Sequence, residues 1–135
     1  MLRILSLLFL CSFGAFEPTP APDTICVKHI ESPGYSHVAI TANLQGSVVL
    51  RITIDGDGRV IEANGTGAHR LLCDNAEKNV RLWTFSKPAQ APYVHSIVYE
   101  YKLEGPAVNF TPAPKISFDL PDRVSITTRP EILNN

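Results

Sequence analysis

The acidic stretch Asp55-Gly56-Asp57-Gly58 contains the residue types that come closest to a metal site. A calcium loop of the EF-hand type supplies oxygen ligands at positions 1, 3 and 5, a glycine at position 6 and a glutamate at position 12. Counted from Asp55, positions 5, 6 and 12 hold Arg59, Val60 and Thr66, so these ligands are missing. The sequence therefore predicts a tight turn at residues 55–58 and no calcium site.

The histidines and serines do not form a recognisable catalytic pattern. His29, His37, His69 and His95 lie in different segments, and no two of them have the spacing of metal ligands on one predicted element. No G-x-S-x-G elbow or comparable motif places a nucleophile beside a base. We therefore expect no enzymatic activity, no metal site and no small-molecule cofactor.

Cys26 and Cys73 are the cysteines that remain if the N-terminal segment described below is removed. An even number of cysteines in an oxidising compartment is consistent with a disulfide. Such a bridge requires the two Cα atoms to approach within about 7 Å. Neither cysteine has the CxxC spacing of a redox motif or a zinc knuckle. A Cys26–Cys73 bridge and two free thiols both stay open at this point.

The composition fits one small domain with appendages. The chain has 135 residues and a formal net charge of −1. Its length and its 44% of hydrophobic residues are enough to bury a single core. Lysines and arginines form no basic stripe and are not interleaved with aromatic residues, so we expect no nucleic-acid partner. The expected partners are proteins.

Residues 1–14 have the pattern of a secretory signal peptide. Arg3 precedes an apolar run from Ile4 to Phe13, and small residues mark a cleavage site before Ala15. The run is too short to span a bilayer comfortably. We therefore expect a periplasmic or secreted protein, with attachment to the inner membrane if the signal is retained.

Residues 15–26 contain three prolines and are expected to form an extended linker.

The segment 27–105 is predicted to form an α+β domain. Residues 35–44 have the spacing of a short helix, residues 47–54 and 93–103 alternate between apolar and polar, residues 59–63 resume an extended pattern after the turn, and residues 69–83 carry an apolar helical stripe. This order predicts helices packed on one face of a small antiparallel sheet of three strands. The predicted core residues are Leu50, Ile52, Leu72, Ala76, Trp83 and Phe85.

With this order of elements, residues 46–85 resemble the C-terminal domain of TonB-type energy transducers. That family has a glycine that opens a valine-rich strand, a D-x-D/N-G turn, a second strand, a helix of the form L-x-x-A-A that ends in tryptophan, and an aromatic residue just after it. The matching residues here are Gly46, Asp55, Asp57, Gly58, Leu72, Ala76, Trp83 and Phe85. Tyr35 stands where the family has Tyr-Pro, although Ser36 replaces the proline. The resemblance covers residues 35–103.

The resemblance implies a bacterial, periplasmic protein-binding module. The family pairs an edge strand with a short extended segment of an outer-membrane transporter, by adding a strand to a sheet. The corresponding strand here is residues 93–103, and its expected partner-binding residues are Tyr93, His95, Ile97, Val98, Tyr99 and Tyr101. Another envelope protein or a second copy of the chain is an alternative partner.

Two departures argue against a force-transmitting role. The family's full transducers combine a retained transmembrane helix with a long proline-rich spacer. Here the apolar run and the linker are both short. The resemblance therefore implies a link to envelope transport through binding, without force transmission.

Residues 106–135 form a C-terminal tail that is predicted to contain a β-hairpin. Ile116, Phe118 and Leu120 alternate before Pro121-Asp122, and the same alternation resumes with Val124 and Ile126. A free edge strand invites unwanted pairing and is normally covered. We expect the tail to lie along the edge of strand 93–103, where a partner would pair. A tail without fixed structure is one alternative, and a structural protein with a sealed edge and no transport role is the alternative function.

Overall fold

A computed structural model describes residues 24–132 of the chain. The predicted signal peptide at 1–14 and most of the predicted linker at 15–26 lie outside these described residues. The elements, in chain order, are β1 (Val27–His29), α1 (His37–Thr41), β2 (Gly46–Ile54), β3 (Val60–Gly67), α2 (Arg70–Val80), β4 (Thr84–Phe85), β5 (Tyr93–Leu103), β6 (Lys115–Asp119) and β7 (Arg123–Thr128).

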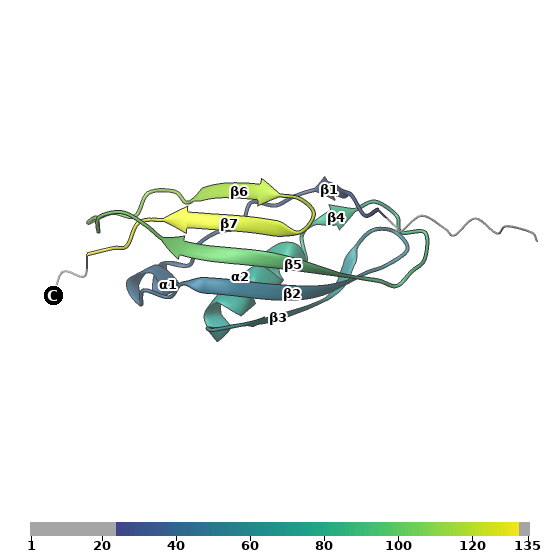
Figure 1. Ribbon diagram of the computed structural model, residues 1–135, viewed down its shortest axis with the longest axis horizontal. Coiled ribbons are helices and arrows are strands. Elements are labelled where there is room, and N and C mark those ends of the chain that lie inside the picture. The colour runs from purple at the N-terminus through teal and green to yellow at the C-terminus, as the bar shows by residue number, and fades with distance from the viewer. Residues whose placement is uncertain (1–23, 133–135) are drawn as a thin grey trace, which may run out of the picture.

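The main sheet has five strands in the order β3-β2-β5-β7-β6, and β1 pairs separately with β4. The α+β class is as expected, but the expectation of a three-stranded antiparallel sheet is wrong. The tail adds two strands, and β7 runs parallel to β5. The physical reason is that Val124 and Ile126 of β7 bury completely beside β5, so the hairpin extends the core as well as the sheet. Figure 1 shows the five strands side by side, with α2 behind β5 and β2.

The turn at residues 55–58 uses its carboxylate to hold the main chain. The N–H groups of Asp57 and Arg59 donate to Oδ1 of Asp55, at 3.0 and 2.9 Å. Gly58 has a φ of +85°, and a Cβ there would lie 2.0 Å from the carbonyl oxygen of Phe85. Only glycine therefore fits, and the carbonyl of Gly58 accepts from the N–H of Phe85 at 2.8 Å. This geometry agrees with the predicted turn and ties β4 to the start of β3.

The core lies between the sheet and α2. All six predicted core residues are buried. Trp83 anchors the layer because its indole N–H lies 3.1 Å from both the carbonyl oxygen of Glu31 and Oδ1 of Asn79. The hydroxyl of Tyr99 on β5 donates to the same Oδ1 atom at 2.7 Å. These bonds join the segment before α1, the end of α2 and the central strand.

Candidate protein-binding edge

β5 is a central strand, which corrects the expectation that residues 93–103 form the edge of the sheet. β2 pairs with it along Tyr93–Tyr101, and β7 pairs with it along Val98–Leu103. Of the predicted partner-binding residues, Val98, Tyr99 and Tyr101 therefore lie between two strands, whereas Tyr93, His95 and Ile97 pair with β2 alone within residues 24–132. The tail fills the position beside β5, because it carries apolar side chains at the alternate positions that this place in the core requires.

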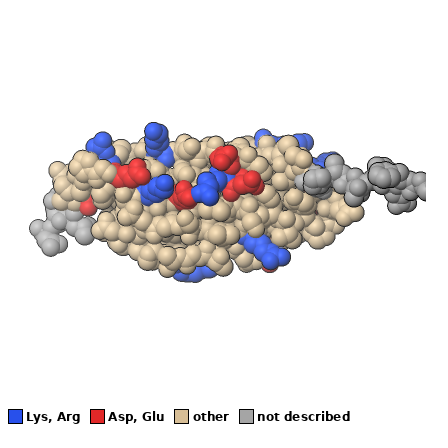
Figure 2. Space-filling model, in the orientation of Figure 1, with Lys and Arg blue, Asp and Glu red and all other residues tan. Residues whose placement is uncertain are grey.

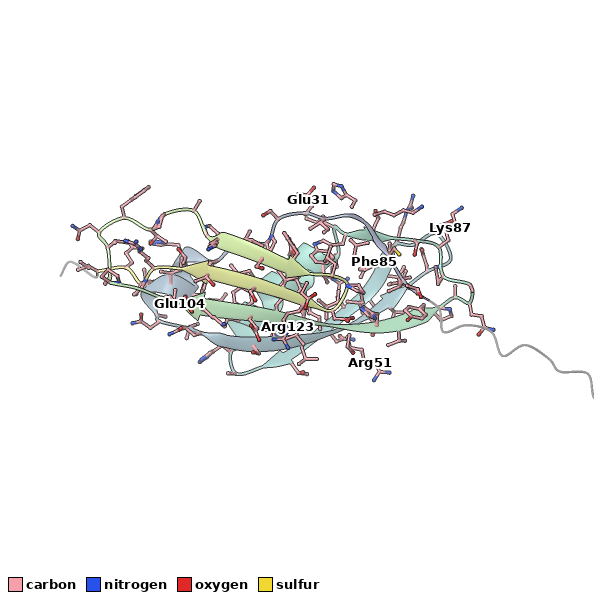
Figure 3. All side chains as sticks on the ribbon, turned by 45° about the horizontal axis from the view of Figure 1, so that its top comes forward. Glu31, Arg51, Phe85, Lys87, Glu104 and Arg123 are labelled. Carbon is pink, nitrogen blue, oxygen red and sulfur yellow. The ribbon has the colours of Figure 1, made fainter. Side chains whose placement is uncertain are left out.

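The pairing between β5 and β7 can be followed through its main-chain hydrogen bonds. The N–H of Val98 donates to the carbonyl of Asp122 at 2.8 Å, and the N–H of Glu104 donates to the carbonyl of Thr128 at 2.8 Å. Because strand residues alternate in the side to which their main-chain groups point, those of Val98, Glu100 and Lys102 face β7. Figure 3 labels Arg123 and Glu104, which lie near the two ends of this pairing.

Charged side chains join the same two strands on the face turned away from α2. Arg123 of β7 forms an ion pair with Glu100 of β5, and Lys102 lies 3.8 Å from the same carboxylate. The hydroxyl of Ser125 donates to the second oxygen of Glu100 at 3.3 Å. Figure 2 shows acidic and basic side chains gathered near the middle of this face. The tail is therefore held to β5 by polar contacts outside and by apolar contacts inside.

The tyrosines of β5 point into the core. Tyr99 and Tyr101 are both almost fully buried, and the ring of Tyr101 packs edge-on against that of Tyr35 with centroids 5.2 Å apart. Burial raises the pKa of the Tyr35 phenol to about 12. Burial likewise raises the pKa of Tyr99 and Tyr101 above the ordinary value. These phenols are neutral and act in packing, so the side chains of Tyr99 and Tyr101 are not available to a partner.

The first half of β5 is not paired with β7, and the turn between β6 and β7 reaches it through the side chain of His95. Nε2 of His95 lies 3.2 Å from the carbonyl oxygen of Pro121 and 3.3 Å from Oδ1 of Asp122. The ring of Tyr93 stacks beside that of His95, with centroids 6.3 Å apart. His95 therefore contacts the tail and Tyr93 lies beside His95, whereas Ile97 is fully buried.

Side chains of α2 bond to two main-chain groups on the outer edge of β3. The N–H of Gly65 donates to Oε1 of Glu77 at 2.7 Å, and a guanidinium nitrogen of Arg81 lies 3.4 Å from the carbonyl oxygen of Ala63. Arg70 holds the same glutamate at 3.1 Å. Glu77 and Arg81 thus occupy outward main-chain groups of β3. Sequence reasoning missed this role, although their spacing of four places them on one side of the predicted helix.

β6 forms the other edge of the five-stranded sheet and is mostly exposed. Within residues 24–132, its only strand partner is β7. Sequence reasoning predicted the hairpin but did not single out this strand as the open edge. The available signal was the exposed, charged composition of Lys115 to Asp119 beside the more apolar Val124 to Ile126.

The remaining candidate residues are dispersed. Cys26 is exposed and Cys73 is buried, and both are free thiols in the structure. The described part of the chain contains no group of three or more His, Cys, Asp or Glu residues arranged to hold a metal ion. Among the helices of residues 24–132, none is long and apolar enough to cross a membrane.

Comparison with known proteins gives one match. A family model described as the C-terminal of the Gram-negative bacterial TonB protein matches residues 31–103, more than half of the chain. No curated protein and no solved structure matches significantly. The matched range ends at the last residue of β5, so the hairpin of β6 and β7 lies beyond it. The sequence resemblance is thereby confirmed, and the chain belongs to the TonB C-terminal family.

Proposed function

We propose that this chain is an exported protein-binding module of the bacterial envelope that pairs a partner strand with β5 in exchange for its own tail. The partner is an extended segment of an outer-membrane transporter or of another envelope protein. The observation that carries the proposal is the parallel pairing of β7 along Val98–Leu103. The tail lies where the family resemblance puts the partner, and it lies outside the matched family range.

The buried face of the tail supports a definite chemistry for the partner strand. Val124 and Ile126 are fully buried, and Thr128 is nearly so. Removing two such aliphatic side chains from the core costs about 1.5 to 3 kcal/mol each. A competing strand must replace this burial. It would therefore carry small or branched apolar side chains at alternate positions and leave the intervening positions polar.

The proposal requires no bond-making by this chain. The TonB C-terminal family is a family of protein-interaction domains, which supports a binding role. In strand addition, main-chain hydrogen bonds supply much of the contact and the pockets for alternate side chains supply selectivity. On this proposal the main-chain groups of Val98, Glu100 and Lys102 would receive the partner.

The second candidate function is a structural envelope protein whose tail seals β5 permanently. The complete burial of Val124 and Ile126 favours it, because displacement of the tail would open the core. A peptide or an envelope protein could then not pair with β5, because β7 would keep its place beside that strand.

A reversible lock on the tail separates the two functions. Glu100 and Ser125 are register partners on adjacent strands, so Glu100→Cys with Ser125→Cys places two thiols within disulfide range. Cys11 and Cys26 are changed to serine in this background. The probe is a fluorescent peptide with the sequence of residues 122–129.

The proposal predicts that the reduced double variant binds the peptide and that the oxidised, locked form does not. The Glu100→Cys single variant, treated with the same oxidant, is the control and should bind in both states. Retention of an outer-membrane transporter from envelope extracts should follow the same pattern. Absence of peptide binding to the reduced protein would contradict the exchange and favour the sealed structural role.

A further inference from the structure

On the outer edge of β6, the main-chain groups of two residues point outward and can pair with another strand. The main chain of Asp122 and Thr128 faces β5, so that of Arg123, Ser125 and Thr127 faces β6. Their register partners in β6 are Asp119, Ser117 and Lys115. By the same alternation, the main-chain groups of Ile116 and Phe118 point outward. In residues 24–132 no main-chain bond from another element is made to either residue.

This edge also exposes apolar surface that a neighbouring strand would cover. Ile116 is half-buried, Phe118 is 39% exposed and the adjoining Leu120 is 43% exposed. Phe118 contributes part of its ring to the core, with its centroid 6.2 Å from that of Trp83. An exposed edge strand with apolar side chains is a typical site of pairing between chains.

The charges of β6 are arranged symmetrically about its centre. Lys115 and Asp119 end the strand, two residues on either side of Ser117. Neither takes part in an ion pair with another residue of the described chain, whereas the nearby Glu100 and Arg123 are paired with each other. Both side chains project on the same face as Ser117, because strand residues two apart share a face.

We infer that β6 pairs antiparallel with β6 of a second copy, across a two-fold axis at Ser117. In this register Ile116 lies opposite Phe118 of the second copy, so the outward groups exchange main-chain hydrogen bonds on both sides of the axis. Lys115 lies opposite Asp119 of the second copy, and the reverse, so each unpaired charge gains an opposite one. Such a self-complementary contact closes as a dimer and does not propagate.

The neighbouring registers are worse for a local reason. A shift of two residues toward the N-terminus would place Pro114 opposite Phe118, and proline has no N–H to donate. A shift of two residues the other way would use Leu120, which belongs to the turn before β7. The register centred on Ser117 is therefore the one that uses every outward group of β6. The inference concerns the partner-free protein and does not depend on the exchange proposed at β5.

Cysteine cross-linking tests both the dimer and its register. Opposite residues at a position without main-chain bonds have Cα atoms about 4.5 Å apart, which suits a disulfide. In a background with Cys11→Ser and Cys26→Ser, purified Ser117→Cys should therefore form a cross-linked dimer on mild oxidation. Lys115→Cys alone should not, because its two copies would lie roughly 13 Å apart. Mixed with Asp119→Cys, it should cross-link.

Charge reversal tests the same contact without cross-linking. Lys115→Asp places like charges opposite each other twice in the dimer, and we expect the dimer dissociation constant in sedimentation experiments to rise on the order of tenfold. The double variant Lys115→Asp with Asp119→Lys restores opposite charges and should recover the affinity. The exposed Lys87→Asp, on the loop before β5, is the matched control and should change nothing.

Three results would overturn the inference. The first is a Ser117→Cys protein that stays monomeric under oxidation at concentrations up to about 1 mM. The second is a Lys115→Cys protein that cross-links with itself as readily as Ser117→Cys, which would indicate parallel pairing. The third is a dimer whose stability is unchanged by both charge variants, which would place the contact on another surface.

Discussion

At the scale of single residues, this molecule assigns most of its distinctive side chains to packing. Asp55 holds a turn, the tyrosines of β5 lie in the core, and Trp83 links α2 to the segment before α1. The sequence was sufficient to predict the turn and the six core residues, because local spacing determines both. It did not show that Glu77 and Arg81 would bond to the outer edge of β3, since that role depends on where α2 crosses the sheet.

Replacing Trp83 with alanine should lower the free energy of unfolding by about 3 to 5 kcal/mol, because it removes a buried ring and leaves a cavity. Urea unfolding followed by circular dichroism measures the change. The neighbouring Leu82→Ala is the control, since Leu82 is 59% exposed and should cost little. Equal losses in the two variants would show that Trp83 is not an anchor of the core.

Replacing Asp55 with alanine should cost about 1 kcal/mol, because two main-chain N–H groups lose their acceptor in the turn. Thermal unfolding in the presence and absence of calcium measures both the loss and any metal effect. We expect no stabilisation of either protein by calcium. A calcium-dependent rise in the melting temperature that disappears in Asp55→Ala would refute the turn interpretation.

Raised tyrosine pKa values predict a loss of stability in alkali. Unfolded tyrosine titrates near pH 10, and burial raises the pKa of Tyr35 to about 12 in the folded chain. This contribution to stability is therefore fully present below about pH 10 and is lost as pH rises toward about 12. Urea unfolding at several pH values should show the decline, and Tyr35→Phe should make it shallower. Identical slopes in the two proteins would contradict the prediction.

At the scale of elements, the strands were predictable and their neighbours were not. Alternation in the sequence indicated β2, β5 and the hairpin of the tail. Alternation reports only that a strand has a buried face, and it does not say beside which strand it lies. The helix predicted at 35–44 is shortened to α1 at 37–41, consistent with the weak helical preference of its Val, Ile and Thr residues.

β7 should contribute to the stability of the whole domain, because its apolar side chains lie in the core. Ile126→Ala removes a fully buried side chain and should cost about 2 to 5 kcal/mol in urea unfolding. Phe110→Ala lies in the same tail but at a position that is 81% exposed, so it serves as the matched control with little expected cost. A negligible loss in Ile126→Ala would mean that β7 does not pack against the domain in solution.

At the scale of the whole molecule, the chain is a TonB C-terminal domain enlarged by its own tail. The family part contributes three strands of the sheet and α2, and the hairpin moves the open edge outward from β5 to β6. Both the proposed strand exchange at β5 and the inferred pairing at β6 would use this hairpin. The proposed exchange requires that the tail leave β5 while the rest of the domain stays folded.

Native-state hydrogen exchange measures whether the tail opens separately from the rest of the domain. The N–H groups of Val98 and Glu104 donate to the tail, whereas the main chain of Tyr99 faces β2. We expect the N–H groups of Val98 and Glu104 to be protected but to exchange through an opening of lower free energy than that of Tyr99. Exchange of all three through one shared global opening, or no protection at Val98 and Glu104, would contradict it.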